Sequence, residues 1–149
     1  MTVNPIPEGY HSVTPYLVVE GAAGLIDFLK QAFGATEKER FLRPDGLIGH
    51  AEVKIGDSIV MLSDAGEQGK PMHTGIHLYV EDADAVYRRA LQAGATSLSE
   101  PGDQFYGDRS AGVQDPRGNT WWISTHFEDL TPEEIVERGK GAFAQPSPH

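Results

Sequence analysis

A pattern of about sixty residues occurs twice in this chain of 149 residues. The tripeptide Gly-Ala-Thr marks both copies, at residues 34–36 and 94–96. Before each tripeptide lies an apolar run closed by an acid, Glu20 or Glu81, and then an amphipathic stretch of helical period. Short alternating segments follow each tripeptide. The repeat predicts two copies of one βαβββ unit. Because a single unit leaves a sheet face uncovered, pairing two of them creates a shared concave site.

Hydrophobic periodicity and turn residues predict the elements of both units. In the first unit we expect strands over 12–19, 36–42, 50–55 and 58–63, and a helix over 22–33. In the second we expect strands over 75–80, 97–100, 109–114 and 120–125, and a helix over 83–93 that Asp82 caps. A capping box at Thr131 and Glu134 predicts a C-terminal helix over about 131–142.

The expected fold class is therefore α+β in a single domain, residues 1–149. Two tandem βαβββ modules, about 12–64 and about 74–127, would form a curved mixed sheet around a cleft, followed by the C-terminal helix. A net charge of −10 disfavours nucleic acid as a partner, because its phosphates would be repelled. The chain has no cysteine, which excludes disulfides and thiolate sites. Without a secretory or membrane-spanning pattern, we expect a soluble, cytoplasmic protein.

The segment Asp115-Pro116-Arg117-Gly118-Asn119 stands just before the last expected strand, with the residue order of a type I turn. A paired βαβββ chain with this turn resembles the vicinal oxygen chelate superfamily of glyoxalases, extradiol dioxygenases and bleomycin-resistance proteins. Residues 49–52, 77–80 and 103–109 are similar to a poorly characterised, glyoxalase-like bacterial branch. The resemblance implies a small-molecule ligand and a homodimer whose clefts the partner chain completes.

Enzymes of that superfamily hold a divalent metal with one residue from the first and one from the fourth strand of each unit. The resemblance carries these positions onto Thr14, Met61, Gly75 and Trp122. None of the four is a competent ligand. A shift of two residues keeps the strand face and reaches Tyr16 and His77. We therefore expect no metal at the usual positions and no cofactor.

Strand alternation predicts that the cleft face carries Tyr16, His50, Glu52, Lys54, His77, Tyr79 and Trp122. Together, His50, Glu52 and His77 could hold a relocated divalent metal. Alternatively, Glu52 and His77 could be catalytic as general base and acid without a metal. A third interpretation has His50 and Glu52 only solvated, or paired with Lys54 or Arg109.

The aromatic residues of this face could form a wall for a flat or apolar ligand, with Phe105 and Tyr106 added from the loop before Arg109. Plain core packing is the alternative, and it is the expectation for Trp121. Arg109 could clamp a carboxylate or phosphate at the cleft mouth, or only hold the loop through Asp108 or Glu52. His73 and His126 lie near strand ends and are expected at the surface.

Two functional hypotheses follow. The first is a small-molecule-binding protein that lacks the metal quartet and holds an aromatic or apolar ligand in the cleft. The second is a lyase or isomerase acting on a small oxygenated substrate through Glu52 and His77, with or without a relocated metal. A dimerising module without a ligand is a third hypothesis, but it leaves the polar strand faces unexplained.

Overall fold

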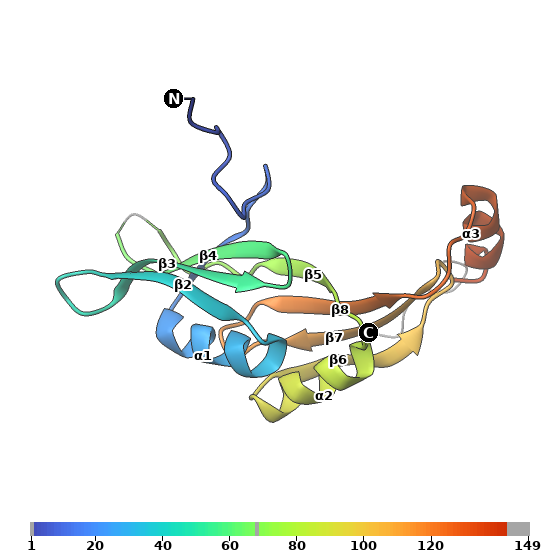
Figure 1. The fold of residues 1–149 in the computed structure, drawn as a ribbon. Helices are drawn as coiled ribbons and strands as arrows, with labels where there is room; N and C mark the ends of the chain where they lie inside the picture. The colour runs from blue at the N-terminus through green and yellow to red at the C-terminus, as the bar shows by residue number, and fades with distance from the viewer. Residues whose placement is uncertain (1, 68, 143–149) are drawn as a thin grey trace.

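The computed structural model describes residues 2–67 and 69–142 (Figure 1). The first half contains β1 (Tyr16–Val19), α1 (Ala22–Phe33), β2 (Thr36–Leu42), β3 (Ile48–Ile55) and β4 (Ser58–Asp64). The second half contains β5 (Gly75–Tyr79), α2 (Ala83–Gln92), β6 (Thr96–Asp103), β7 (Asp108–Gln114) and β8 (Thr120–His126), and α3 (Pro132–Gly139) follows. The predicted α+β fold with a C-terminal helix is confirmed.

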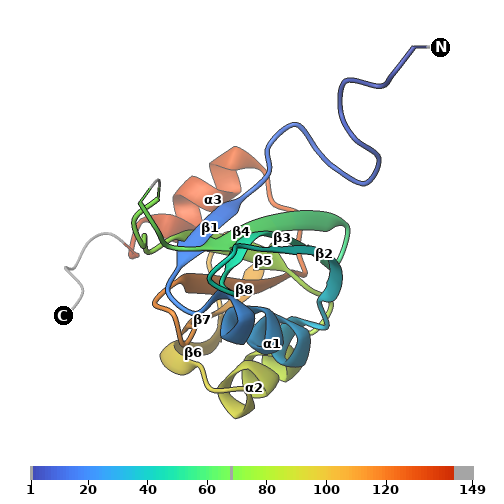
Figure 2. The same cartoon turned by 90° about the vertical axis from the view of Figure 1, so that its left-hand side faces the viewer.

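Each half builds a four-stranded sheet with the same strand order, β1-β4-β3-β2 in the first and β5-β8-β7-β6 in the second. The pairs β1–β4 and β5–β8 are parallel, and the other pairs are antiparallel. Helices α1 and α2 contact each other and lie on the same side of the two sheets (Figures 1 and 2). We call the sides of the sheets that face away from these helices the first and the second open face.

The helix-facing side chains form the core, as the alternation predicts. Leu17 and Val53 of the first sheet and Trp121 and Ile123 of the second are fully buried. Phe33 at the end of α1 packs on Trp121, with the ring centroids 4.8 Å apart, so the core continues from one half to the other. Burying large aromatic surface in this way is a major source of folding free energy.

The last strand of each half ties its own sheet to the helix of that half. In the first half, Asp64 accepts hydrogen bonds from the backbone N–H groups of Gly21 and Ala22, both at 2.9 Å, and from that of Ile48 at 2.8 Å. At the corresponding place in the second half, the hydroxyl of Thr125 accepts from the N–H of Ala83 at 2.9 Å. These bonds satisfy donors that a helix N-terminus otherwise leaves unpaired.

The Asp115–Asn119 turn also has a structural role. The N–H of Gly118 donates to the carbonyl oxygen of Asp115 at 3.0 Å, which closes the predicted turn. Gly118 has a positive φ, a conformation that glycine adopts without strain. The Asp115 carboxylate accepts from the side chains of Asn119 and Trp121 at 3.0 and 2.8 Å. The motif that carries the family resemblance is thus a structural anchor for β8.

Two strands differ from the prediction by three residues or more at one end. The first begins at Tyr16 rather than at residue 12, since Pro15 has no N–H to donate to a ladder. The strand β6 runs to Asp103 instead of residue 100 and includes Pro101. As an edge strand it can include a proline, because one side of its backbone is unpaired. Helix α3 begins at the capping box, as predicted, and ends at Gly139.

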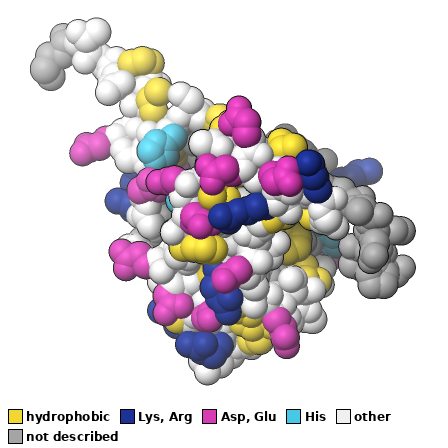
Figure 3. All heavy atoms as spheres, turned by 90° about the vertical axis from the view of Figure 1, so that its right-hand side faces the viewer, with side chains coloured by type: hydrophobic (Ala, Val, Ile, Leu, Met, Phe, Trp, Pro, Cys, Tyr) yellow, Lys and Arg dark blue, Asp and Glu magenta, His cyan; other side chains and the backbone are white. Residues whose placement is uncertain are grey.

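Charged side chains are mixed over the end of the molecule that carries α3, where acidic groups are prominent between basic and apolar ones (Figure 3). Within residues 2–67 and 69–142, none of the helices has both the length and the apolar character that crossing a bilayer requires.

Candidate functional site

The first open face carries a hydrogen-bonded row of three side chains that the sequence had indicated. His50 and Glu52 project from β3, and their Nε2 and Oε2 atoms lie 2.9 Å apart. Tyr16 of β1 reaches His50 Nδ1 with its hydroxyl at 3.4 Å, and the two rings are 5.7 Å apart. A hollow of about 700 Å³ adjoins Tyr16 and is also lined by Val18, Arg43 and Ser63. This face can therefore offer both aromatic surface and polar groups to a ligand.

Tyr10, which precedes β1, completes the row. Its hydroxyl donates a hydrogen bond to Glu52 Oε1. The hydrogen bond from Tyr10, together with the one from His50, lowers the pKa of Glu52 despite its burial. Burial and the same bond raise the pKa of Tyr10 to about 12. Glu52 is thus a carboxylate that accepts from two donors, which makes it a strong acceptor but a weak general base.

The second open face is the more aromatic of the two. His77 lies opposite Trp122 in the β5–β8 register, and the rings of His77 and Tyr79 are 5.0 Å apart. The six-membered ring of Trp122 fills the space that a side chain at position 112, a glycine, would need. Tyr79 and Trp122 remain 60% and 41% exposed. A hollow of about 380 Å³ on this face is lined by His77, Ser99, Gln104, Tyr106, Ser110 and Trp122.

A second tyrosine–carboxylate–histidine network closes one end of this face. The buried carboxylate of Asp108 accepts from the Tyr79 hydroxyl and pairs with His126 Nδ1, both at 2.7 Å. His126 Nε2 reaches Asp129 Oδ1, also at 2.7 Å. Burial would raise the pKa of Asp108, but the hydrogen bonds from His126 and Tyr79 outweigh it and the pKa is lowered. The bond to Asp108, followed by that to Asp129, raises the pKa of His126.

The structure brings together only some of the predicted site residues. His50 and Glu52 lie on the first sheet, whereas His77 lies on the second. In the part of the chain that the structure describes, no three His, Cys, Asp or Glu side chains are arranged to hold a metal ion. The predicted group of His50, Glu52 and His77 therefore does not form within one chain.

The four residues onto which the resemblance carries the metal-ligand positions include no strong metal ligand. Thr14 lies ahead of β1, and Gly75, the first residue of β5, has no side chain. Met61 and Trp122 lie across from Tyr16 and His77 in the parallel ladders. A thioether and an indole are poor partners for a hard or borderline divalent cation.

Arg109 is held away from the open face, contrary to both of its expected roles. Its guanidinium lies on the helix side of β7 and bonds Asp84 of α2 at 2.9 Å and Asp103 of β6 at 3.0 Å. These two carboxylates raise its pKa, and the pair to Asp84 joins α2 to the sheet. Neither Asp108 nor Glu52, the expected alternatives, is its partner. Phe105 is also displaced from the expected wall: it lies against Gly139 of α3, while its neighbour Tyr106 lines the hollow.

Sequence reasoning missed Tyr10, Lys38 and Gly112. It considered Asp108 only as a partner of Arg109, and it placed His126 at the surface without a role. Tyr10 lies in a segment without periodicity, so no pattern assigned it to a face. Lys38 is the extra residue of a β-bulge, where alternation fails. A signal for His126 did exist, because it follows Trp122 and Ser124 at every second position and so shares their face.

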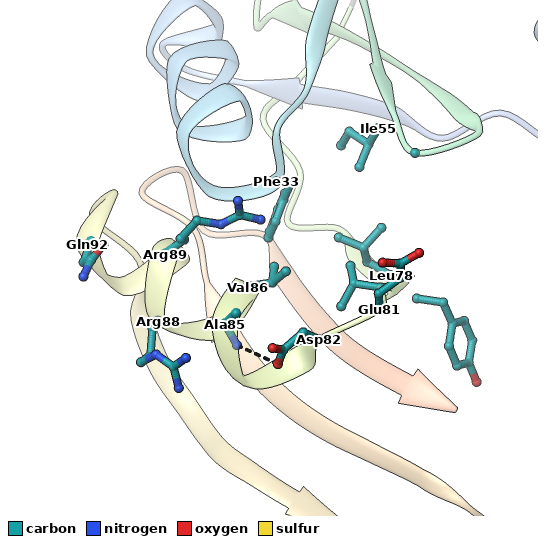
Figure 4. Close-up of a pocket in the computed structure, with 13 residues that line it drawn as sticks. Phe33, Ile55, Leu78, Glu81, Asp82, Ala85, Val86, Arg88, Arg89 and Gln92 are labelled. Carbon is teal, nitrogen blue, oxygen red and sulfur yellow. Dashed lines mark hydrogen bonds between the residues drawn. The ribbon is translucent and has the colours of Figure 1, made fainter. Parts of the chain in front are cut away.

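A groove of about 650 Å³ lies elsewhere, between the end of α1, α2 and the β3–β4 turn (Figure 4). Its floor is apolar, with Phe33, Leu78 and Val86, and Arg89 extends from α2 towards Phe33. Of the predicted site residues, only Tyr79 borders it. We place the candidate site on the open faces, because the exposed aromatic and titratable side chains gather there.

Residues 9–123 match the family described as the Glyoxalase/Bleomycin resistance protein/Dioxygenase superfamily. The chain belongs to this superfamily. It is 38% identical over 146 residues to an uncharacterized protein of Mycobacterium bovis, covering 91% of this chain and 93% of that one. An uncharacterized protein of Mycobacterium tuberculosis is also 38% identical, with 91% and 84% covered.

Two solved structures show the same fold as this chain. TioX from Micromonospora sp. ML1 superposes with a TM-score of 0.68 at 26% identity, covering 78% of this chain and 99% of that one. A glyoxalase-related enzyme from Fulvimarina pelagi superposes with a TM-score of 0.62 at 15% identity, with 78% and 88% covered. At that lower identity the likeness concerns the fold alone.

Proposed function

We propose that this protein binds a small aromatic or apolar molecule on its open faces. The observation that carries the proposal is Trp122, which leaves 41% of its surface exposed beside His77 and Tyr79. The family resemblance also carries one of the metal-ligand positions onto this residue. Large aromatic side chains gain free energy when a ligand covers them, so exposed ones that share a hollow favour a binding role.

We propose further that the site is shared between two copies of the chain. The first and second open faces belong to different sheets, and the residues expected to act together are divided between them. In a homodimer, the first open face of one copy could lie opposite the second open face of the other. Tyr16 and Glu52 would then stand across the ligand from the partner's Trp122 and the partner's Tyr79.

The test uses proflavine, a flat cationic dye, because the chain carries a net charge of −10. Fluorescence anisotropy should show saturable binding, and Trp122→Ala should weaken it by about tenfold or more, as expected for the loss of an aromatic contact. Val136→Ala, which trims an exposed apolar residue on α3, is the matched control and should bind like the wild type. Equal affinity in both variants would reject the proposed site. Acridine-9-carboxylate, a flat dye with a negative charge, measures the effect of ligand charge.

The alternative is an acid–base enzyme acting on a small oxygenated substrate. The His50–Glu52 pair favours it, since a buried carboxylate that orients an imidazole is a common device for a general base. This assigns the base to His50 rather than to Glu52 with His77. The test is proton NMR of hydroxyacetone in deuterium oxide. If the wild type accelerates the exchange of the carbon-bound hydrogens and His50→Gln abolishes this acceleration, the enzyme is established. If the wild type does not accelerate the exchange, the enzyme is rejected.

A further inference from the structure

The Tyr10 side chain is held on the first open face as a bound phenol would be. Its hydroxyl donates to Glu52, and the Lys38 ammonium lies 4.8 Å from the centroid of its ring. An ammonium over an aromatic face is an attractive cation–π arrangement. The ring and the hydroxyl of Tyr10 thus each have a dedicated partner.

The groups around this phenol form a built site. Glu52 is only 9% exposed and is held from its other oxygen by His50. Lys38 reaches the same face because it is the extra residue of the bulge in β2, and its charge also lowers the pKa of Glu52. Glu39 lies beside Glu52 in the ladder, which adds a second carboxylate to this part of the face. A buried carboxylate needs such donors, since an unpaired one is costly.

The segment that carries Tyr10 is attached lightly. Residues 2–9 are exposed, and the segment rises away from the sheets (Figure 1). Next to Tyr10, His11 makes an exposed contact with the carbonyl of Asp57 at 3.3 Å. Tyr10 precedes β1, which begins at Tyr16. Its side chain could therefore leave Glu52 without breaking a strand pair.

We propose that Glu52, His50 and Lys38 form a subsite for the hydroxylated aromatic ring of a ligand, and that Tyr10 occupies this subsite until such a ligand displaces it. The carboxylate accepts and cannot donate, so the ligand must bring a hydrogen-bond donor, and the phenol of Tyr10 at this place favours an O–H group on the ring. This names the ligand class within the proposed binding function and rests on it, but the subsite can be tested by itself. The raised pKa of Tyr10 is consistent with a site that holds a neutral phenol.

The experiment removes the internal phenol and offers its free analogue. In Tyr10→Ala, p-cresol should bind saturably at one molecule per chain, shifting the amide signals of Lys38, His50 and Glu52 in proton–nitrogen NMR spectra. Wild-type protein should bind it at least about tenfold more weakly, because a tethered side chain competes at high effective concentration. The matched ligand control is 4-methylanisole, which has the same ring without a donor and should not bind.

Two further variants keep the test decisive. Glu52→Gln in the Tyr10→Ala background should abolish the preference for p-cresol over 4-methylanisole, because the charged acceptor is gone. If Tyr10→Ala does not fold, Tyr10→Phe removes only the hydroxyl and should take up p-cresol more readily than the wild type. The inference is overturned if folded Tyr10→Ala fails to bind p-cresol, if both ligands bind equally, or if Tyr10→Phe behaves like the wild type. The dye test depends on Trp122 and the cresol test on Glu52, so each can fail alone.

Discussion

The absence of a side chain at one glycine decides the shape of the second open face. Trp122 can lie over β7 only because residue 112 has no side chain. The neighbouring glycine of the same face, Gly75, has open space where a methyl group would be. These two glycines therefore give a matched pair of substitutions.

We expect Gly112→Ala to push the Trp122 ring into solvent and to weaken proflavine binding about tenfold, as the loss of a central aromatic contact does. The free energy of unfolding should fall by no more than about 1 kcal/mol, because a half-exposed ring can move aside instead of straining the core. Trp122 emission should shift to longer wavelength. Gly75→Ala should leave both emission and binding unchanged; a similar loss there would contradict the explanation.

Asp64 gives a prediction about stability. Asp64→Ala removes acceptors from three backbone donors, two at the start of α1 and one in β3, and should cost about 2–4 kcal/mol in the free energy of unfolding. Thr125→Val removes one such bond from α2 and the bond that its hydroxyl donates to the Val80 carbonyl at 2.8 Å, and should cost about 1–2 kcal/mol. Urea unfolding compares the two variants. Equal costs would show that the number of capping bonds is not what matters.

At the scale of elements, the sequence predicted the bounds of a helix or strand correctly where a strong hydrophobic period coincides with residues that end the element. Helix α1 and strand β2 have the predicted bounds, because Gly34 stops the helix in the left-handed conformation and the turn follows β2. The open-face residues of β1, β3, β5 and β8 followed from alternation alone. Arg109 was expected at the cleft mouth, at the start of its strand, whereas alternation within β7 places it on the helix side. Tyr10 could not be assigned, since its contact with Glu52 spans 42 positions without a periodic signal.

The stability of the junction between β8 and α3 should depend on pH. The pKa of His126 is raised in the folded protein by Asp108 and Asp129, so its stabilising effect is complete below the unfolded value of 6.5 and is lost as pH rises through the folded pKa. Tyr79 and His77 are the other titratable groups near Asp108. We therefore expect the amides of Phe127 and Glu128, which bond Gly107, to lose protection against hydrogen exchange at the higher pH.

Proton NMR titration of His126, combined with exchange protection factors, checks this expectation. The variant His126→Gln should have weaker protection at low pH and no change across the range. A folded pKa for His126 at or below 6.5 would contradict the network.

At the scale of the whole molecule, a shared site predicts complementation between two inactive variants. Tyr16→Ala damages the first open face and Trp122→Ala the second, so each homodimer should lose proflavine binding. After equal amounts are mixed and exchanged, half of the dimers are mixed and each has one intact site. Binding should thus return to about a quarter of the wild-type sites. No recovery, with dimers confirmed by light scattering, would place the whole site within one chain.

The two sides of each sheet have different roles, and this affects which mutations such a protein can tolerate. The bonds that set the architecture, from Asp64, Thr125, Asp115 and Arg109, lie at the helix side or in turns. Side chains such as Tyr16 and His77 stand on the other side and carry little of the core. Substitutions there should alter the free energy of unfolding by only about 0.5 kcal/mol. New ligand preferences can therefore arise by mutation, or be introduced by engineering, without first stabilising the scaffold.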